Sequence, residues 1–298
     1  MSCKYCFVSI LSPPERISDD FMIKNIALLI RPDIEDEKKK WLQCIIKFLD
    51  AQNIHYYFTE SLRPLKFCEF LKFRDFDLMI VLGGDGMMLE AARFCAPRDI
   101  PIFGLNFGKE GFLTAGKNSE KFTDAINAVL NNSDYIENRT LVEARIYRNG
   151  NQIFSEQLAL NELYVNGGGK SLTLSFDING LFEKVIIADG LMVSTPTGST
   201  AYNLNTGPII SPDIECLLVR PVHPYGFYIM PPLVVDTKSK ILVYLINCKG
   251  LDINICADGQ EYIRDLEIKD IIEITAFRKP AKIIRLYEND FWAKLQNF

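Results

Sequence analysis

A buried-strand pattern that ends in a glycine-rich turn constrains this chain more than any other feature. The run DLMIVL, at residues 77–82, is almost entirely apolar, which is typical of a strand covered on both faces of a parallel sheet. Gly83-Gly84-Asp85-Gly86 follows directly, and MMLEAARFC then places apolar residues at helical spacing. This order of strand, turn and helix predicts that Asp85 lies at the carboxyl edge of a sheet, where ligands bind.

The same alternation extends over the first half of the chain. The run IALLI at 26–30 predicts a strand, residues 36–50 predict an amphipathic helix, and IPIFGLN at 100–106 predicts a further strand. Strands alternating with helices up to about Leu130 predict a doubly wound parallel sheet covered by helices. The segment 1–23 is mixed in character and receives no function.

After about Asn138 the pattern changes to short β-branched runs broken by Gly, Asn and Asp. Examples are VEARIYR, TLSFDI, KVIIADG, ILVYLI, LDINICAD and IIEITAF. This half is expected to be nearly all β and sandwich-like. The predicted fold class is therefore α/β plus β, with an α/β domain followed by a β-rich domain.

Composition narrows the classes of function. A net charge of −5 in 298 residues removes any electrostatic reason to expect nucleic acid as the main partner, so a small-molecule substrate is favoured. The chain has no apolar run of membrane-spanning length and no signal-peptide pattern, and its eight cysteines are irregularly spaced. We expect a cytoplasmic protein without disulfides or membrane contact. Cys3 and Cys6 have metal-ligand spacing, but no second pair follows, so no metal site is expected there.

Two motifs have the residue types that phosphoryl transfer needs. Glycines around Asp85 let the backbone approach a ligand, and one carboxylate at a helix start suits a general base. Asp85 could instead simply cap the helix. The segment 194–202 packs five hydroxyl side chains ahead of Tyr202, which could line a nucleotide site or form a Ser/Thr turn leading into a helix at Ala201.

These residues resemble a known family. GGDGMMLEAAR, NFGKEGFL, ALNELYV, ADGLMVSTPTGSTAYN and ICADGQ occur in the order and approximate spacing found in bacterial NAD kinases, from about residue 25 to the end. GGDG alone also resembles an element of phosphofructokinases and of lipid kinases. The DGLMVSTPTGSTAY segment is much more specific. The resemblance implies a kinase that phosphorylates the 2′-hydroxyl of the adenosine ribose of NAD to form NADP.

The resemblance also implies roles for individual residues. Asp85 matches the family's catalytic aspartate, which would deprotonate the ribose hydroxyl. Asn161 and Glu162 match a pair that holds the adenine side and a ribose hydroxyl, and Asp189 matches an aspartate near the nicotinamide end. For most of these residues the alternative to a binding role is a purely structural role, in a turn or in the core. The remaining matched contacts are Gly86 and Phe112, the stretch Thr200, Ala201, Tyr202, Asn203, Leu204 and Asn205, and Gln260 from the β-rich half.

The family fold implies a substrate cleft between two domains, here 1–138 and 139–281, with 282–298 returning to the first domain. Relatives use ATP, or sometimes polyphosphate, together with magnesium, and they assemble as dimers or tetramers. The chain is thus expected to bind NAD, ATP and Mg²⁺ and to form a homodimer or homotetramer. The sequence itself reveals no magnesium ligand set.

The sequence departs from the family pattern at several positions. Met87 follows GGDG where threonine is common, Glu110 and Ala115 replace a usual leucine and aspartate, and Gly207-Pro208 lacks one glycine. The segment 221–232 aligns poorly and receives no binding role. The departures at Met87 and Glu110 keep open a noncatalytic NAD or NADP sensor. A lipid or sugar kinase that shares GGDG and a phosphatase acting on NADP are further alternatives.

Overall fold

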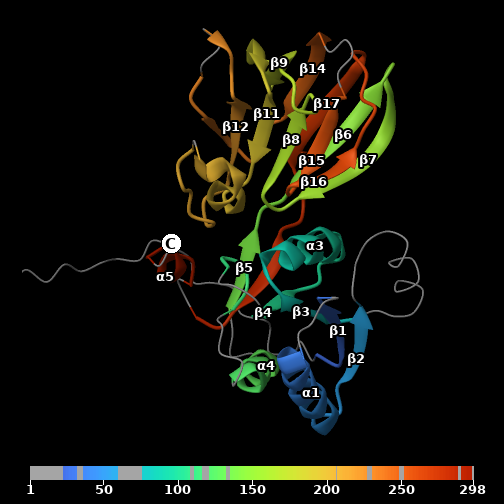
Figure 1. Cartoon of the computed structure of the whole chain (residues 1–298), viewed down its shortest axis with the longest axis vertical. Helices are drawn as coiled ribbons and strands as arrows, with labels where there is room; N and C mark the ends of the chain where they lie inside the picture. The colour runs from blue at the N-terminus through green and yellow to red at the C-terminus, as the bar shows by residue number, and fades with distance from the viewer. Residues whose placement is uncertain are drawn as a thin grey trace, which may run out of the picture.

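A computed structural model describes the chain in two halves (Figure 1). The residues described are 23–31, 36–59, 76–107, 111–115, 121–131, 135–205, 207–226, 230–247, 252–287 and 290–296. The Cys3 and Cys6 pair, Glu110, most of the N-terminal segment and residues 227–229 lie outside these ranges. No helix within them is long and apolar enough to cross a membrane.

The N-terminal half is built on a six-stranded sheet in the order β2-β1-β3-β4-β18-β5. Neighbouring strands pair in parallel except β18 and β5, which are antiparallel. All six residues of β3 are buried, as a strand covered on both faces requires. The strands are β1 (Asn25–Ile30), β2 (His55–Thr59), β3 (Leu78–Gly83), β4 (Ile102–Asn106), β5 (Tyr135–Arg139) and β18 (Ala281–Arg285).

Helices cover both faces of this sheet. On one face α1 (Asp36–Ala51) and α4 (Phe122–Leu130) pack against Leu28, Ile80 and Leu82. On the other face α3 (Asp85–Cys95) packs against Val81 and Ile102 and continues into a 3₁₀ turn (Ala96–Arg98). Alternate residues of each strand thus serve two separate cores.

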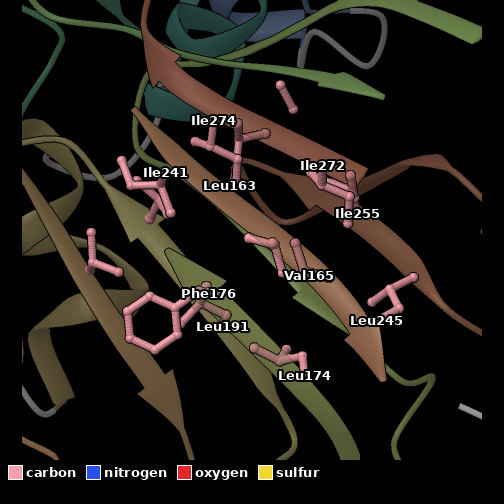
Figure 2. Packing of buried hydrophobic residues seen from close by; sticks show 14 of the residues in the cluster. Leu163, Val165, Leu174, Phe176, Leu191, Ile241, Leu245, Ile255, Ile272 and Ile274 are labelled. Carbon is pink, nitrogen blue, oxygen red and sulfur yellow. The ribbon is translucent and has the colours of Figure 1, made fainter. Parts of the chain in front are cut away.

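The C-terminal half is a sandwich of two six-stranded, antiparallel sheets. Their orders are β10-β9-β14-β17-β6-β7 and β13-β12-β11-β8-β15-β16. Figure 2 shows Leu163 and Leu191 of one sheet facing Phe176 and Ile272 of the other. The strands are β6 (Val142–Arg148), β7 (Asn151–Ala159), β8 (Glu162–Asn166), β9 (Leu172–Ile178), β10 (Phe182–Ala188), β11 (Gly190–Ser194), β12 (Cys216–Val222), β13 (Leu233–Asp236), β14 (Ile241–Asn247), β15 (Asn254–Ala257), β16 (Gln260–Ile263) and β17 (Asp270–Ala276).

The two halves share a core around α3. Leu141, Leu158, Leu160 and Phe277, at the near end of the sandwich, belong to the same buried cluster as the apolar face of this helix. In Figure 1 α3 accordingly lies directly beneath the sandwich. The helix that begins at Asp85 is therefore held by both halves.

The predicted fold class is confirmed, including the return of the C-terminal tail to the first domain. After β17 the chain adds β18 between β4 and β5, and α5 (Asp290–Gln296) then lies beside this sheet (Figure 1). The exact limits, 1–138 with 282–298 and 139–281, remain a prediction. No α-helix begins at Ala201, because this stretch forms two short 3₁₀ turns, Thr197–Thr200 and Tyr202–Asn205.

The insertion of β18 makes a testable stability prediction. Ile283 is fully buried in β18 and is paired with Ile102 of β4, so Ile283→Ala should lower the free energy of unfolding by about 2–5 kcal/mol. Ile268→Ala, at a half-exposed turn position of the other half, should change it by less than about 0.5 kcal/mol. Urea denaturation measures both. Equal small effects would mean that β18 is not part of the core.

Candidate active site

Asp85 lies at the carboxyl end of β3 and forms the first residue of α3, as the sequence predicted. Its Oδ2 accepts a 2.7 Å hydrogen bond from the amide of Phe112, and its Oδ1 accepts one of 3.1 Å from the amide of Leu113. Gly111 lies against the same carboxylate, since a Cβ there would come within 2.2 Å of Oδ1. The side chain is half-buried, and Gly86 beside it is exposed. The carboxylate is thus oriented by backbone amides at the surface instead of pointing into the core.

Asn161 and Glu162 lie at the start of β8, where a buried aspartate holds the turn. Asp258 Oδ1 accepts a 2.7 Å hydrogen bond from the amide of Asn161, and Oδ2 accepts one of 3.2 Å from the amide of Leu160. Arg93, in the last turn of α3, donates to the same Oδ2. The helix that starts at Asp85 is therefore tied by an ion pair to the Asn161 turn of the other half.

The two acidic side chains of this turn differ in their electrostatics. Burial, together with the smaller effect of the nearby Asp258 carboxylate, raises the pKa of Glu162 to about 8. Glu162 Oε2 is buried without a hydrogen-bond partner among the described residues, as suits a protonated acid. Burial also raises the pKa of Asp258, but Arg93 and two amides oppose the rise. The proton of this pair therefore belongs on Glu162 at neutral pH.

The hydroxyl-rich segment 194–200 is packed onto the same turn. The carbonyl of Asn161 accepts hydrogen bonds from the amide of Thr195, at 2.9 Å, and from the hydroxyl of Ser194, at 3.2 Å. Gly198 is needed here, because a Cβ would lie 2.2 Å from that carbonyl oxygen. Ser194, Thr195 and Ser199 are fully buried, so these hydroxyls hold the turn together and do not line a nucleotide surface. Thr200, which is half-buried, donates to the carbonyl of Thr197.

Asp189 has two partners that the sequence did not predict. Its Oδ1 accepts a 3.0 Å hydrogen bond from Ser171, and its Oδ2 lies 3.1 Å from Nδ1 of His223. His223 comes from the segment 221–232 that had received no role, and it is largely exposed. Asp189 directly precedes β11, whereas Ser194 ends this strand opposite Glu162. The Asp189 group and the Asn161 turn are therefore separated by roughly 17 Å along β11.

Aromatic rings lie between these two groups. Tyr202 is 41% exposed, and its ring meets the ring of Tyr164 edge-on, with centroids 5.8 Å apart. Arg220 is buried near both rings, and burial lowers its pKa while the two tyrosines oppose this change. Tyr202 is thus partly exposed, whereas its neighbour Asn203 is fully buried and its side-chain amide has no hydrogen-bond partner among the described residues.

The predicted residues thus fall into connected groups. Gln260 is exposed and begins β16, two residues beyond the Asp258 that binds the Asn161 turn. Ala201 and Leu204 are half-buried and Asn205 is exposed beside Tyr202. Phe112 contributes its amide to Asp85, and its ring lies 6.0 Å from that of Phe291. Sequence reasoning assigned no role to four residues of the site: Arg93, Asp258, Ser171 and His223. Two of them lay in quoted motifs, Arg93 at the end of GGDGMMLEAAR and Asp258 in ICADGQ.

Known proteins match this chain over most of its length. A family model described as ATP-NAD kinase N-terminal domain matches residues 28–135, and one described as ATP-NAD kinase C-terminal domain matches residues 160–286. The NAD kinase of Treponema denticola is 34% identical over 226 residues, which cover 75% of this chain and 78% of the relative. The NAD kinase of Moorella thermoacetica is 36% identical over 220 residues, covering 72% of this chain and 68% of the relative.

Solved structures share the fold. The yeast NADH kinase, determined in complex with NADH, superposes with a TM-score of 0.80 at 20% identity, covering 96% of this chain and 92% of that one. An NAD kinase from Archaeoglobus fulgidus, in complex with ATP, gives a TM-score of 0.69 at 24% identity, covering 92% of this chain and 99% of that one. None of these findings supports a lipid kinase, a sugar kinase or a noncatalytic sensor. The chain belongs to the NAD kinase family, the enzymes that transfer a phosphoryl group from ATP to NAD to form NADP.

Proposed function

We propose that Asp85 is the general base that takes the proton from the 2′-hydroxyl of the adenosine ribose of NAD. The observation that carries this proposal is the carboxylate held by the amides of Phe112 and Leu113 at the sheet edge. Each carboxylate oxygen has two lone pairs, so one on each remains for a substrate hydroxyl. The ribose oxygen then bonds to the γ-phosphorus of ATP, the bond to the bridging oxygen breaks, and ADP leaves with the electron pair.

Residues of the sandwich would hold the dinucleotide. Asn161 and Glu162 would contact the adenine side and a ribose hydroxyl, since an amide both donates and accepts hydrogen bonds. Tyr202 would offer its exposed face to a base, and Asp189 would lie near the nicotinamide. The separation of these groups along β11 suits a ligand as extended as a dinucleotide. Gly86, Phe112, Thr200, Ala201, Asn203, Leu204, Asn205 and Gln260 complete the proposed set of contacts.

The metal, the assembly and the location are further parts of the proposal. Among the described residues no group of three His, Cys, Asp or Glu side chains could hold a metal ion, so no protein ligand is assigned to magnesium. Magnesium bound mainly by the phosphates of the donor would neutralise the charge of the transferring phosphoryl group. A cytoplasmic location is proposed from the irregular spacing of the eight cysteines, which is typical of proteins from a reducing compartment. A homodimer or homotetramer, and polyphosphate as a second donor, are proposed from the family alone.

The role of Asp85 makes a direct prediction. Asp85→Asn keeps an oxygen that accepts one amide but loses the base, so kcat for NADP formation should fall by about 10²–10⁴-fold. Asp124→Asn is the matched control, because Asp124 is exposed on α4 at the opposite face of the sheet. This variant should retain wild-type kcat in the same assay. Wild-type kcat in Asp85→Asn would exclude Asp85 as the base.

The raised pKa of Glu162 predicts a pH dependence of stability. The folded-state pKa of about 8 exceeds the ordinary glutamate pKa of 4.5, so the folded protein binds more protons than the unfolded chain between these pH values. The stabilising contribution of protonated Glu162 is therefore complete below about pH 4.5 and is lost as the pH rises through 8. Glu162→Gln should abolish this loss. The free energy of unfolding of the variant, relative to that of wild type, should therefore increase between pH 5.5 and 8.5 by on the order of a few kcal/mol.

Urea denaturation of both proteins at the two pH values measures this difference. Glu215→Gln is the control, because Glu215 is exposed, and it should follow the wild type at both pH values. A constant difference between Glu162→Gln and wild type would show that Glu162 titrates normally.

A further inference from the structure

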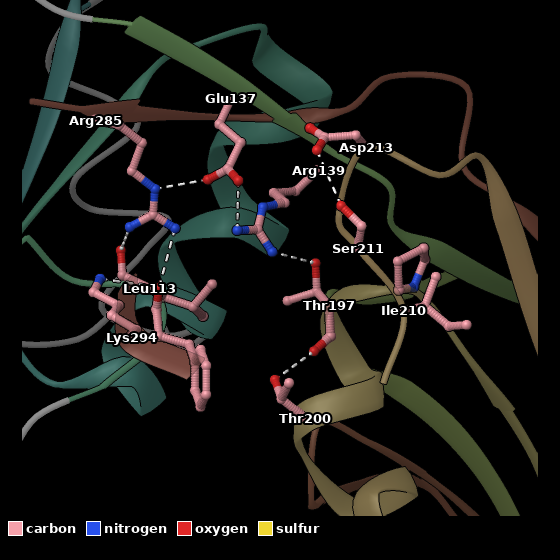
Figure 3. A network of polar contacts seen from close by, with 12 residues as sticks. Leu113, Glu137, Arg139, Thr197, Thr200, Ile210, Ser211, Asp213, Arg285 and Lys294 are labelled. Carbon is pink, nitrogen blue, oxygen red and sulfur yellow. Dashed lines mark hydrogen bonds and ion pairs between the residues drawn. The ribbon is translucent and has the colours of Figure 1, made fainter. Parts of the chain in front are cut away.

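The loop segment Phe112–Thr114 lies between Asp85 and the C-terminal segment of the chain. Its amide groups face Asp85, as described above. Its carbonyl groups face two cations from the C-terminal segment, Arg285 of β18 and Lys294 of α5 (Figure 3). The segment therefore connects the carboxylate on one side with two positive charges on the other.

The contacts on the carbonyl side are short and numerous. Arg285 donates to the carbonyls of Leu113 at 2.8 Å and Phe112 at 3.1 Å. Lys294 donates to the carbonyls of Thr114 at 2.6 Å and Phe112 at 3.2 Å. The carbonyl of Phe112 and the amide of Leu113 belong to one peptide group, so the same group binds both cations and Asp85. Hydrogen bonds in such a chain polarise and strengthen one another.

A half-buried carboxylate holds the orientation of Arg285. Glu137 of β5 accepts a 2.6 Å bond from Arg285 through Oε2 and a 2.7 Å bond from Arg139 through Oε1 (Figure 3). Burial alone would raise the pKa of Glu137, but the Arg285 and Arg139 guanidiniums outweigh it and bring the pKa to about 2. Glu137 is therefore ionised in the whole physiological range and pairs with both guanidiniums.

The same network reaches the hydroxyl-rich turn of the sandwich. Arg139, which is 1% exposed, donates a 3.2 Å hydrogen bond to the hydroxyl of Thr197. The path thus runs from Thr197 through Arg139, Glu137 and Arg285 to the loop that binds Asp85. Within the described part of the chain, this is a second link between the halves besides Arg93 and Asp258.

We propose that Arg285 is a positioning residue for the transfer reaction. It fixes the backbone of Phe112 and Leu113, so that the amides of these two residues aim the Asp85 carboxylate at the acceptor hydroxyl. This inference rests on the proposed role of Asp85 as the base. Lys294 supports the same peptide, and Glu137 keeps the Arg285 side chain in place. The C-terminal segment is thereby a part of the catalytic machinery, although none of its side chains needs to touch the substrate.

Substitution of Arg285 should affect turnover more than binding. Arg285→Ala should lower kcat by about 10²-fold, because a small displacement of the base costs this much. The KM for NAD should stay within about threefold of wild type, since the Asn161 turn is held separately by Asp258. Arg285→Lys should recover part of the lost kcat, because lysine keeps the charge but not the forked geometry. Arg278→Ala, an exposed arginine three residues before β18, is the control and should behave as wild type.

A double-variant cycle on the full-length enzyme separates positioning from a general structural role. If Arg285 acts through Asp85, adding Arg285→Ala to Asp85→Asn should change kcat by less than about twofold. If the two losses multiply, Arg285 acts elsewhere and the inference is overturned. Should Arg285→Ala not fold, as judged by circular dichroism, the same cycle with Arg285→Lys decides the question. Wild-type kcat in Asp85→Asn would instead reject the proposed base, so the two failures are distinguishable.

Discussion

Asp258 lies buried beneath the Asn161 turn, where it accepts hydrogen bonds from two backbone amides and pairs with Arg93 of α3. An uncompensated charge at this depth would cost several kcal/mol, so each partner requires the other. Because Arg93 and Asp85 belong to the same helix, this ion pair sets the distance and orientation between the base and the turn proposed to hold the nucleotide. The composite site depends on it.

The electrostatics of the site are divided between its two walls. On the sandwich side, Asp258 and Glu162 lie close together, and the proton on Glu162 avoids a second buried negative charge. On the other side, Arg285 and Lys294 donate to the carbonyls of the loop whose amides bind Asp85.

Local sequence patterns predicted much of this structure correctly. The apolar run before Gly83 became the fully buried β3, and the helix expected at 36–50 is α1, which ends one residue later. The β-rich half was predicted equally well, because β-branched runs between turn residues are short-range signals. The segment 194–202 was harder to interpret. Its hydroxyls suggested a surface that lines a nucleotide site, but most of them are buried and donate to backbone carbonyls. The sequence does not show which side chains are buried.

The sequence by itself determined the alternation of strands and helices, the place of Asp85 at a sheet edge and the likeness to NAD kinases, because each depends on neighbouring residues or on short motifs. Only the tertiary structure decided which charged residues meet. Arg93 and Asp258 are 165 positions apart, and Glu137 and Arg285 are 148 apart. No local spacing connects such residues; they are brought together because β18 inserts between β4 and β5 and because the sandwich packs on α3.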